Sequence, residues 1–255
     1  MHILKGYTKQ EISWMMYDWA NSAHSVIIVT LLPIFFDTVA GYTADSVSSM
    51  STWGYATSIA MLIVALAAPF LGVFGDIRGM RKKLFTAFLL LGVASVAGLA
   101  FTRQMGAALQ QGIGPEVISQ NMANLIVFSV FWLLLDLGTT MTNALFMALS
   151  NDVVPCELIG RFVAMFRAVS LGCAIIFNSF LLKYAETEVT LIFLSLAFLY
   201  GFGLLLMCAK VREGEYPPLP AAEKARRGVG KAVRTYFKEC FAMPYYRWVI
   251  GAFVV

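Results

Sequence analysis

Six apolar blocks, each about 20 residues long, constrain what this chain can fold into more than any other feature. A helix of that length crosses the ~30 Å hydrocarbon core of a bilayer. The blocks contain none of the alternating ten-residue segments that build a membrane β-barrel. Charged residues make up only 13% of the chain, which is about half of the ~25% usual in soluble domains. The sequence therefore predicts an all-α integral membrane protein.

The blocks predict six transmembrane helices within an N-terminal domain of residues 1–209. The predicted spans are 12–36, 52–74, 84–102, 122–149, 162–182 and 189–209. Residues 210–244 are predicted to form a basic linker with an amphipathic helix, and the apolar run 245–255 is predicted to begin a seventh helix. That run is too short to span a bilayer. We therefore interpret the chain as a truncated piece of a longer protein, without its C-terminal half.

Basic residues are distributed unevenly between the two sets of loops. Lys and Arg are concentrated in the N-terminal lead, the turn 75–83 and the linker 210–244, whereas the opposite loops hold Arg103 and Lys183. Cytoplasmic loops carry the excess of Lys and Arg, so the N-terminus and the long linker are predicted to be cytoplasmic. This bias also accounts for the net charge of +4, so no nucleic-acid partner is indicated.

The cysteines and the motifs for bound groups indicate neither a disulfide nor a cofactor. Two of the four cysteines fall in predicted spans and two on the cytoplasmic side: Cys156, Cys173, Cys208 and Cys240. Disulfides are rare in such positions. No Cys/His spacing of the zinc type and no G-x-x-x-x-G-K loop occurs. The sequence predicts no metal and no cofactor.

The first predicted span begins with the polar stretch YDWANSAHS, residues 17–25. Asp18, Asn21, His24 and Ser25 share one side of that helix. A carboxylate that faces lipid costs ~2.5–3.5 kcal/mol on insertion scales, so this side is expected to face other helices or a water-filled cavity. Two interpretations remain: polar contacts that hold helices together, or a site for solute or protons.

The fourth span carries a second polar stripe. Its members recur at spacings that place them on one helical face: Ser129, Asp136, Thr140, Asn143 and Ser150. A single buried polar residue is typical of helix packing, whereas a stripe with a carboxylate at its centre indicates a pathway through the bilayer. Arg167 in the fifth span lies ~7 Å from the expected depth of Asp136. We hypothesise that Arg167 pairs with Asp18 or Asp136 and that the pair breaks during transport; a static pair that fixes helix packing is the alternative.

The turn between the second and third spans resembles the cytoplasmic signature of the major facilitator superfamily, G-x-L-A-D-R-x-G-R-K-x-x-L. Five residues match this pattern: Gly72, Asp76, Gly79, Arg81 and Leu84. Phe74, Ile77 and Met80 depart from it, and Arg78 compensates in charge. The resemblance implies a superfamily fold of two six-helix halves, each a 3 + 3 inverted repeat, of which this chain holds the first half.

Two further segments resemble one branch of that superfamily. YDWANSA followed by LLPIFF, and then WGYATSIAMLIVALAAPFLGVFGD, are similar to bacterial relatives of the vacuolar (autophagy-related) amino-acid effluxer family. This resemblance covers roughly residues 13–91 and fades beyond them. It implies a multi-pass protein of the bacterial inner membrane that exports amino acids. VREGEYPP, residues 211–218, is instead similar to the exit from the sixth span in some sugar-transporting relatives.

The resemblance also implies a gating network on the cytoplasmic face. DVVPCELIGR, residues 152–161, resembles the superfamily's turn between its fourth and fifth spans. The implied gating residues are those of the two turns: Gly72, Asp76, Arg78, Gly79, Arg81, Asp152, Glu157 and Arg161. In the superfamily such loops latch the two halves together in one state of the transport cycle.

The sequence therefore predicts a secondary transporter that moves a small polar solute, either an amino acid or a sugar, by alternating access. The candidates for proton coupling, or for coupling to another cation, are Asp18, His24, Asp136 and Arg167. The candidates for solute binding are Asn21, His24, Ser25, Asp136, Asn143 and Asn178. Sugar binding would use Asp136, Asn143 and the ring of Trp132.

A membrane-embedded enzyme is not predicted, because no cluster of nucleophile, base or metal ligands is present in the sequence. A non-transporting membrane protein is the remaining alternative.

Overall fold

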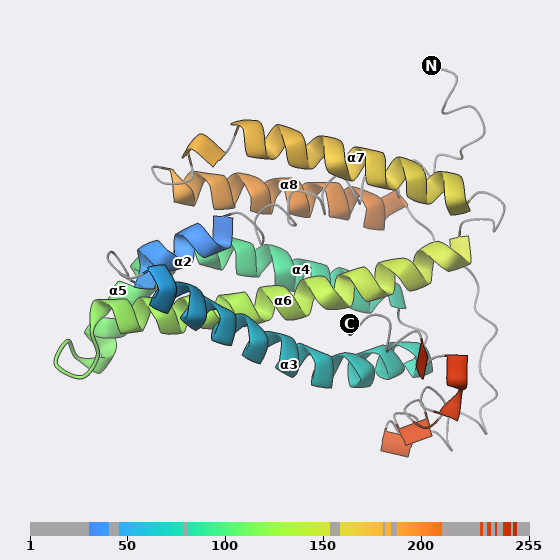
Figure 1. Ribbon diagram of the computed structural model, residues 1–255, viewed down its shortest axis with the longest axis horizontal. Coiled ribbons are helices and arrows are strands. Elements are labelled where there is room, and N and C mark those ends of the chain that lie inside the picture. The colour runs from blue at the N-terminus through green and yellow to red at the C-terminus, as the bar shows by residue number, and fades with distance from the viewer. Residues whose placement is uncertain are drawn as a thin grey trace.

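A computed structural model describes residues 31–40, 46–78, 81–153, 159–180, 182–184 and 188–210, together with individual residues between 230 and 248. These residues form helices and include no β-strand, which confirms the predicted all-α class. The helices are α2 (Leu32–Ala40), α3 (Ser46–Arg78), α4 (Arg81–Ala100), α5 (Thr102–Ile113), α6 (Gln120–Val153), α7 (Ile159–Phe180), the short 3₁₀ turn η2 (Leu182–Tyr184) and α8 (Val189–Lys210). Figure 1 shows the long helices running with their axes roughly aligned, and α4 and α6 lie between α3 and α8.

Helices α4 and α6 pack most closely because small residues meet where they cross. A Cβ atom added at Gly138 on α6 would lie 2.9 Å from the backbone oxygen of Phe88 and 3.1 Å from the backbone nitrogen of Gly92, both on α4. A Cβ added at Gly98 would overlap the ring of Phe131. Glycines thus let the two backbones approach to a separation that no larger side chain would permit, as is common between helices in membranes.

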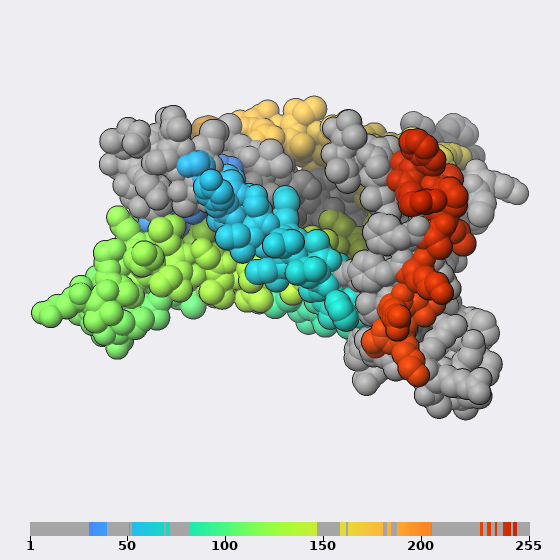
Figure 2. All heavy atoms as spheres, turned by 60° about the horizontal axis from the view of Figure 1, so that its bottom comes forward, coloured from blue at the N-terminus to red at the C-terminus, as the bar shows by residue number. Residues whose placement is uncertain are grey.

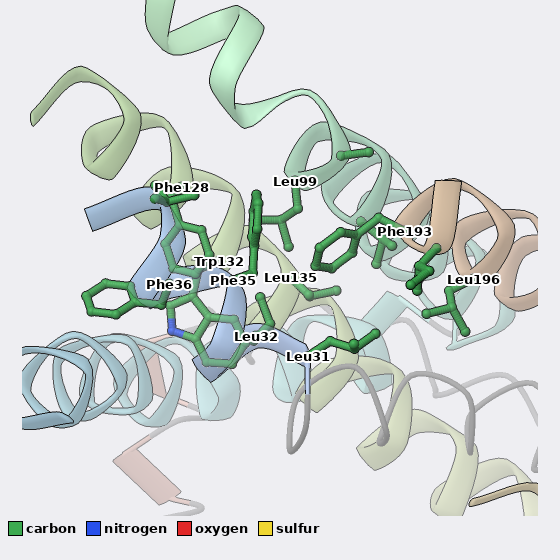
Figure 3. Close-up of a cluster of buried hydrophobic side chains, with 14 of the residues drawn as sticks. Leu31, Leu32, Phe35, Phe36, Leu99, Phe128, Trp132, Leu135, Phe193 and Leu196 are labelled. Atoms are coloured by element: carbon green, nitrogen blue, oxygen red, sulfur yellow. The ribbon is translucent and has the colours of Figure 1, made fainter. Parts of the chain in front are cut away.

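An aromatic cluster packs between α2, α3 and α6. The rings of Trp53 and Trp132 lie 5.3 Å apart, and Phe36 lies 5.3 Å from Trp53 and 5.6 Å from Phe128. Figure 3 shows Phe36, Phe128 and Trp132, together with Phe35, between α2, α6 and the neighbouring helices. Because each ring is apolar and contacts rings from other helices, the cluster ties α2 and α3 to the central helix α6.

The structure overturns the prediction that residues 103–121 form a loop. α5 occupies most of this segment and packs antiparallel against the start of α6 (Figure 1). Gly106 leaves room for Asn124, since an added Cβ would overlap its Oδ1 atom. The side-chain amide of Gln110 donates a hydrogen bond of 3.2 Å to the carbonyl of Ile118, and Gly114 turns the chain with a φ of 113°. The Gly and Gln residues thus build a helical hairpin.

Three helices of the described residues are long and apolar enough, by length and composition, to cross a membrane: Lys82–Ala100, Gln120–Phe146 and Ile159–Phe180. Trp53–Ala68 and Val189–Gly203 are shorter apolar helices. Large apolar side chains such as Ile59, Leu66 and Leu171 are exposed on the outer helices, as expected for a surface that contacts lipid. Figure 2 shows α3 crossing over α6 on one such face.

The helices extend beyond several of the predicted spans. α2 continues past the predicted end of the first span at residue 36, and α3 begins before residue 52. α6 is 34 residues long, so at ~1.5 Å per residue it exceeds the ~30 Å hydrocarbon core. The polar stretch of the first span, with Asp18, Asn21, His24 and Ser25, lies outside the described residues.

Candidate solute site on helix α6

The depth of α6 in the membrane follows from its contact with α4. Lys83 and Arg103 are the charged residues on either side of the apolar part of α4, and Gly92 lies near the middle of the stretch between them. Gly138 on α6 contacts Gly92 directly. Asp136 lies two residues from Gly138, or ~3 Å along the helix axis. Asp136 is therefore near the midplane of the bilayer.

Asp136 is half-buried, and its Oδ2 atom is fully buried without a hydrogen-bond partner among the described residues. Leaving a buried acceptor unpaired costs ~1–3 kcal/mol, and more if the group is charged. Such a cost is rarely retained where the group has no function. Asp136 is therefore the centre of the candidate site.

Trp132 presents a second unpaired group one helical turn from Asp136. Its side chain is 3% exposed, and its indole Nε1 atom has no hydrogen-bond partner in the described part of the chain. Residues four apart lie on the same side of a helix, separated by ~6 Å along the axis. Figure 3 shows the indole of Trp132, with its nitrogen in blue, among the side chains of the aromatic cluster. The residues that carry this donor and this acceptor thus lie on the same side of α6.

Three other buried hydroxyl groups of the bundle donate hydrogen bonds to carbonyls of their own helix. The hydroxyl of Ser95 donates 2.7 Å to the carbonyl of Leu91, and that of Thr139 donates 2.8 Å to the carbonyl of Leu135. Thr142 likewise donates to the carbonyl of Gly138 at 2.6 Å. A carboxylate has no proton to donate to a carbonyl. The unpaired Oδ2 atom of Asp136 thus cannot be satisfied by a carbonyl of its own helix and needs a donor group.

The polar stripe predicted on the fourth span follows α6. Ser129, Thr140 and Asn143 are exposed on the same side of the helix as Asp136. Ser150 also lies on α6, although its side chain is outside the described residues. The stripe thus passes along the helix on both sides of Asp136.

The residues predicted on the fifth span lie on α7 at two depths. Phe146 stacks on Phe166 at 5.5 Å, so Arg167 is level with this part of α6. Asp136 is about nine residues, or ~14 Å, from that level. Asn178 lies near the depth of Asp136, and its amide donates 3.0 Å to the carbonyl of Ala174.

The separation of Arg167 from Asp136 is larger than the ~7 Å expected from the sequence. Arg167 is exposed, and the Oδ2 atom of Asp136 accepts no hydrogen bond from it. Pairing between the two side chains would require α7 to shift along α6. The hypothesis that they pair during transport stays a prediction.

The predicted gating residues that fall on described helices gather at one end of the bundle, on the right of Figure 1. Asp76 and Arg78 lie at the end of α3, Arg81 begins α4, and Asp152 lies at the end of α6. Arg161 is exposed in the first turn of α7, and Gly72 lies within α3. Gly79 and Glu157 lie outside the described residues. The helix ends that flank the two turns therefore lie at the same end of the bundle, and the gating network stays a prediction.

Sequence reasoning treated the indole of Trp132 mainly as a ring and missed its unpaired N–H group. It also missed Gly138, which sets the depth of Asp136 through its contact with α4. The four-residue spacing between Trp132 and Asp136 was visible in the sequence. Whether another side chain satisfied the two groups depended on packing, which the spacing does not reveal.

A 101-residue segment of the chain is 42% identical to an uncharacterized MFS-type transporter, YxiO, of Bacillus subtilis (strain 168). The match covers 39% of this chain and 24% of that protein, so the chain spans about a quarter of the length of this relative. No protein-family model and no solved structure matches the chain. The similarity supports the major facilitator superfamily, which is a class of transporters and not of enzymes, and the helices are consistent with its fold. The resemblance to vacuolar effluxers stays a prediction. Together, the apolar helices and the similarity to YxiO support an integral, multi-pass membrane protein.

Proposed function

We propose that this chain is part of a proton-coupled secondary transporter that moves a small polar solute across the membrane by alternating access. The observation that carries the proposal is the carboxylate of Asp136, near the bilayer midplane, with a buried Oδ2 atom that has no partner among the described residues. A carboxylate in such a place can take up a proton in one state of the cycle and release it in another. The similarity to an MFS-type transporter supports the same conclusion.

Two solute classes are compatible with this mechanism. The resemblance of residues 13–91 to vacuolar effluxers favours an amino acid, whereas the indole and carboxylate on α6 favour a sugar. In either case Asp136 couples protons and the polar face with Asn143 binds solute. The proposed bilayer is the bacterial inner membrane, with the end of the bundle that holds Asp76 and Arg161 facing the cytoplasm. The gating residues at that end close the site from one side.

The test uses the protein as its gene encodes it, reconstituted in proteoliposomes that contain a pH-sensitive dye. Amino acids and sugars are added in turn to vesicles with wild-type protein or with Asp136→Asn. We expect one solute to produce proton movement in the wild type and at least about tenfold less proton movement in the variant. The reason is that a side-chain amide neither takes up nor releases a proton near neutral pH. Thr38→Val, at an exposed hydroxyl that bonds to its own helix, is the control and should transport normally. Equal solute movement in both proteins, without protons, would show that Asp136 does not couple transport to protons.

A further inference from the structure

The two unpaired groups on α6 are chemically complementary to a single kind of ligand atom. The indole N–H of Trp132 only donates, and the ionised carboxylate of Asp136 only accepts. The Nε1 atom of Trp132 and the Oδ2 atom of Asp136 are both buried, and neither bonds to the other or to any other described residue. A ligand that satisfies both must therefore accept at one point and donate at a neighbouring one.

A hydroxyl group meets this requirement because its oxygen accepts one hydrogen bond while its proton is donated in another. An ammonium group has no acceptor for the indole, and a carboxylate has no donor for Asp136. A polyhydroxy compound offers several hydroxyls at spacings of a few ångströms, so it can satisfy the ~6 Å axial step between the two residues with one hydroxyl or with adjacent ones.

An amino acid fits this pair less well for an electrostatic reason. Its ammonium could bond to Asp136 and its carboxylate to the indole of Trp132, but the solute carboxylate would then lie close to a second carboxylate in a low-dielectric site. A cation beside the indole would offset this repulsion. Arg167, the basic residue predicted for that role, is ~14 Å from Asp136 along the helix axis.

The surroundings of the pair also suit an uncharged solute. The ring of Trp132 belongs to the aromatic cluster with Trp53, Phe36 and Phe128, and the C–H faces of a sugar ring pack on such surfaces. Asn143 follows two turns after Asp136 on the same side of α6, and its amide group carries both a donor and an acceptor. A few polar groups on a largely apolar wall are typical of small-molecule sites.

We propose that Trp132 and Asp136 together bind a hydroxyl of the transported solute, so that the solute is a neutral polyhydroxy compound, a sugar or a polyol. This inference rests on the transport function proposed above and names the substrate class of the same site. Trp132 is then a specificity-determining residue, whereas Asp136 both binds the solute and couples the proton.

The test measures binding by isothermal titration calorimetry to the detergent-solubilised protein, as its gene encodes it. The probes are a panel of monosaccharides, disaccharides and polyols and a panel of the protein amino acids. Trp132→Phe keeps an aromatic ring and removes the N–H group, and Asp136→Asn keeps the size and removes the charge. Trp248→Phe, which removes an indole that is 81% exposed, is the matched control.

We expect a sugar or polyol to bind the wild type and the control alike. We expect Trp132→Phe to raise its Kd about threefold to tenfold, and Asp136→Asn to raise it about tenfold or more. The inference is overturned if no sugar or polyol binds. It is also overturned if one binds to Trp132→Phe with the same Kd as to the wild type, which is expected if only water bridges the indole and the carboxylate. If amino acids instead bind and move protons, the substrate class is wrong and the transport function stands. If no compound of either panel binds to the protein or is transported by it, both this inference and the proposed transport function fail.

Discussion

At the scale of single residues, the position of Asp136 depends on a glycine two residues away. Gly138 brings α6 against the backbone of α4, and this contact sets where the carboxylate lies in the bilayer. A methyl group at this position would meet backbone atoms of Phe88 and Gly92, which cannot rotate away as a side chain can. The site therefore rests on close backbone contact and not on a specific side-chain bond.

Replacing Gly138 by Ala should consequently destabilise the protein. Overpacking of this kind costs ~1–3 kcal/mol, so we expect a lower midpoint of thermal unfolding in detergent for Gly138→Ala. The matched control is Gly172→Ala on α7, where an added Cβ has no neighbour within 4 Å. There the gain in helix propensity should leave stability unchanged or slightly higher. Equal midpoints for the two variants would contradict the close packing of α4 against α6.

At the scale of elements, the hairpin of α5 and the start of α6 extends the bundle beyond its apolar part (Figures 1 and 2). Thr102 and Gly106 are buried on the side of α5 that faces α6, while Arg103, Gln104 and Met105 are exposed. The side-chain amide of Gln110 donates to the carbonyl of Ile118 and so links α5 to the turn, while Gln120 donates to Asn124 within α6.

Single cysteines placed through residues 102–108 should therefore react with a membrane-impermeant maleimide in a helical pattern. In a background without the native cysteines, positions 103, 104, 105 and 108 should label rapidly, and position 102 several times more slowly. Burial against α6 is the physical reason. Uniform labelling across the segment would indicate the loop that the composition alone predicts.

At the scale of the whole molecule, the helix ends divide into two sets. The turn at residues 114–119 lies at one end, and the ends of α3 and α6 with the starts of α4 and α7 lie at the other (Figure 1). Most basic residues of the helix-connecting turns fall in the second set. The positive-inside rule therefore predicts that this second end is cytoplasmic.

A topology reporter tests this orientation. Alkaline phosphatase folds only outside the cytoplasm, so its insertion at residue 115 should give an active enzyme. Insertion at residue 80 should give an inactive one, and green fluorescent protein at the same two positions should give the opposite pattern. Phosphatase activity at residue 80 alone would reverse the assignment and move the proposed gate to the other side of the membrane.

The apolar blocks alone determined that this chain forms membrane-spanning helices, because a backbone in hydrocarbon must satisfy its own hydrogen bonds and a helix of ~20 apolar residues does so. Helical periodicity also placed Asp136, Thr140 and Asn143 on one side of the fourth span. These features depend on neighbours along the chain, which a sequence shows directly.

Only the tertiary structure decided which polar groups remain unpaired. Thr139 and Thr142 are satisfied by carbonyls of their own helix, whereas Trp132 and Asp136 have groups whose partner must come from elsewhere. The tertiary structure also decided that residues 102–113 are helical. This helix packs against α6, where Gly106 lies next to Asn124, and no pattern within residues 102–113 indicates that contact. Such contacts join residues distant in the sequence and depend on how the helices pack, so no local pattern reveals them.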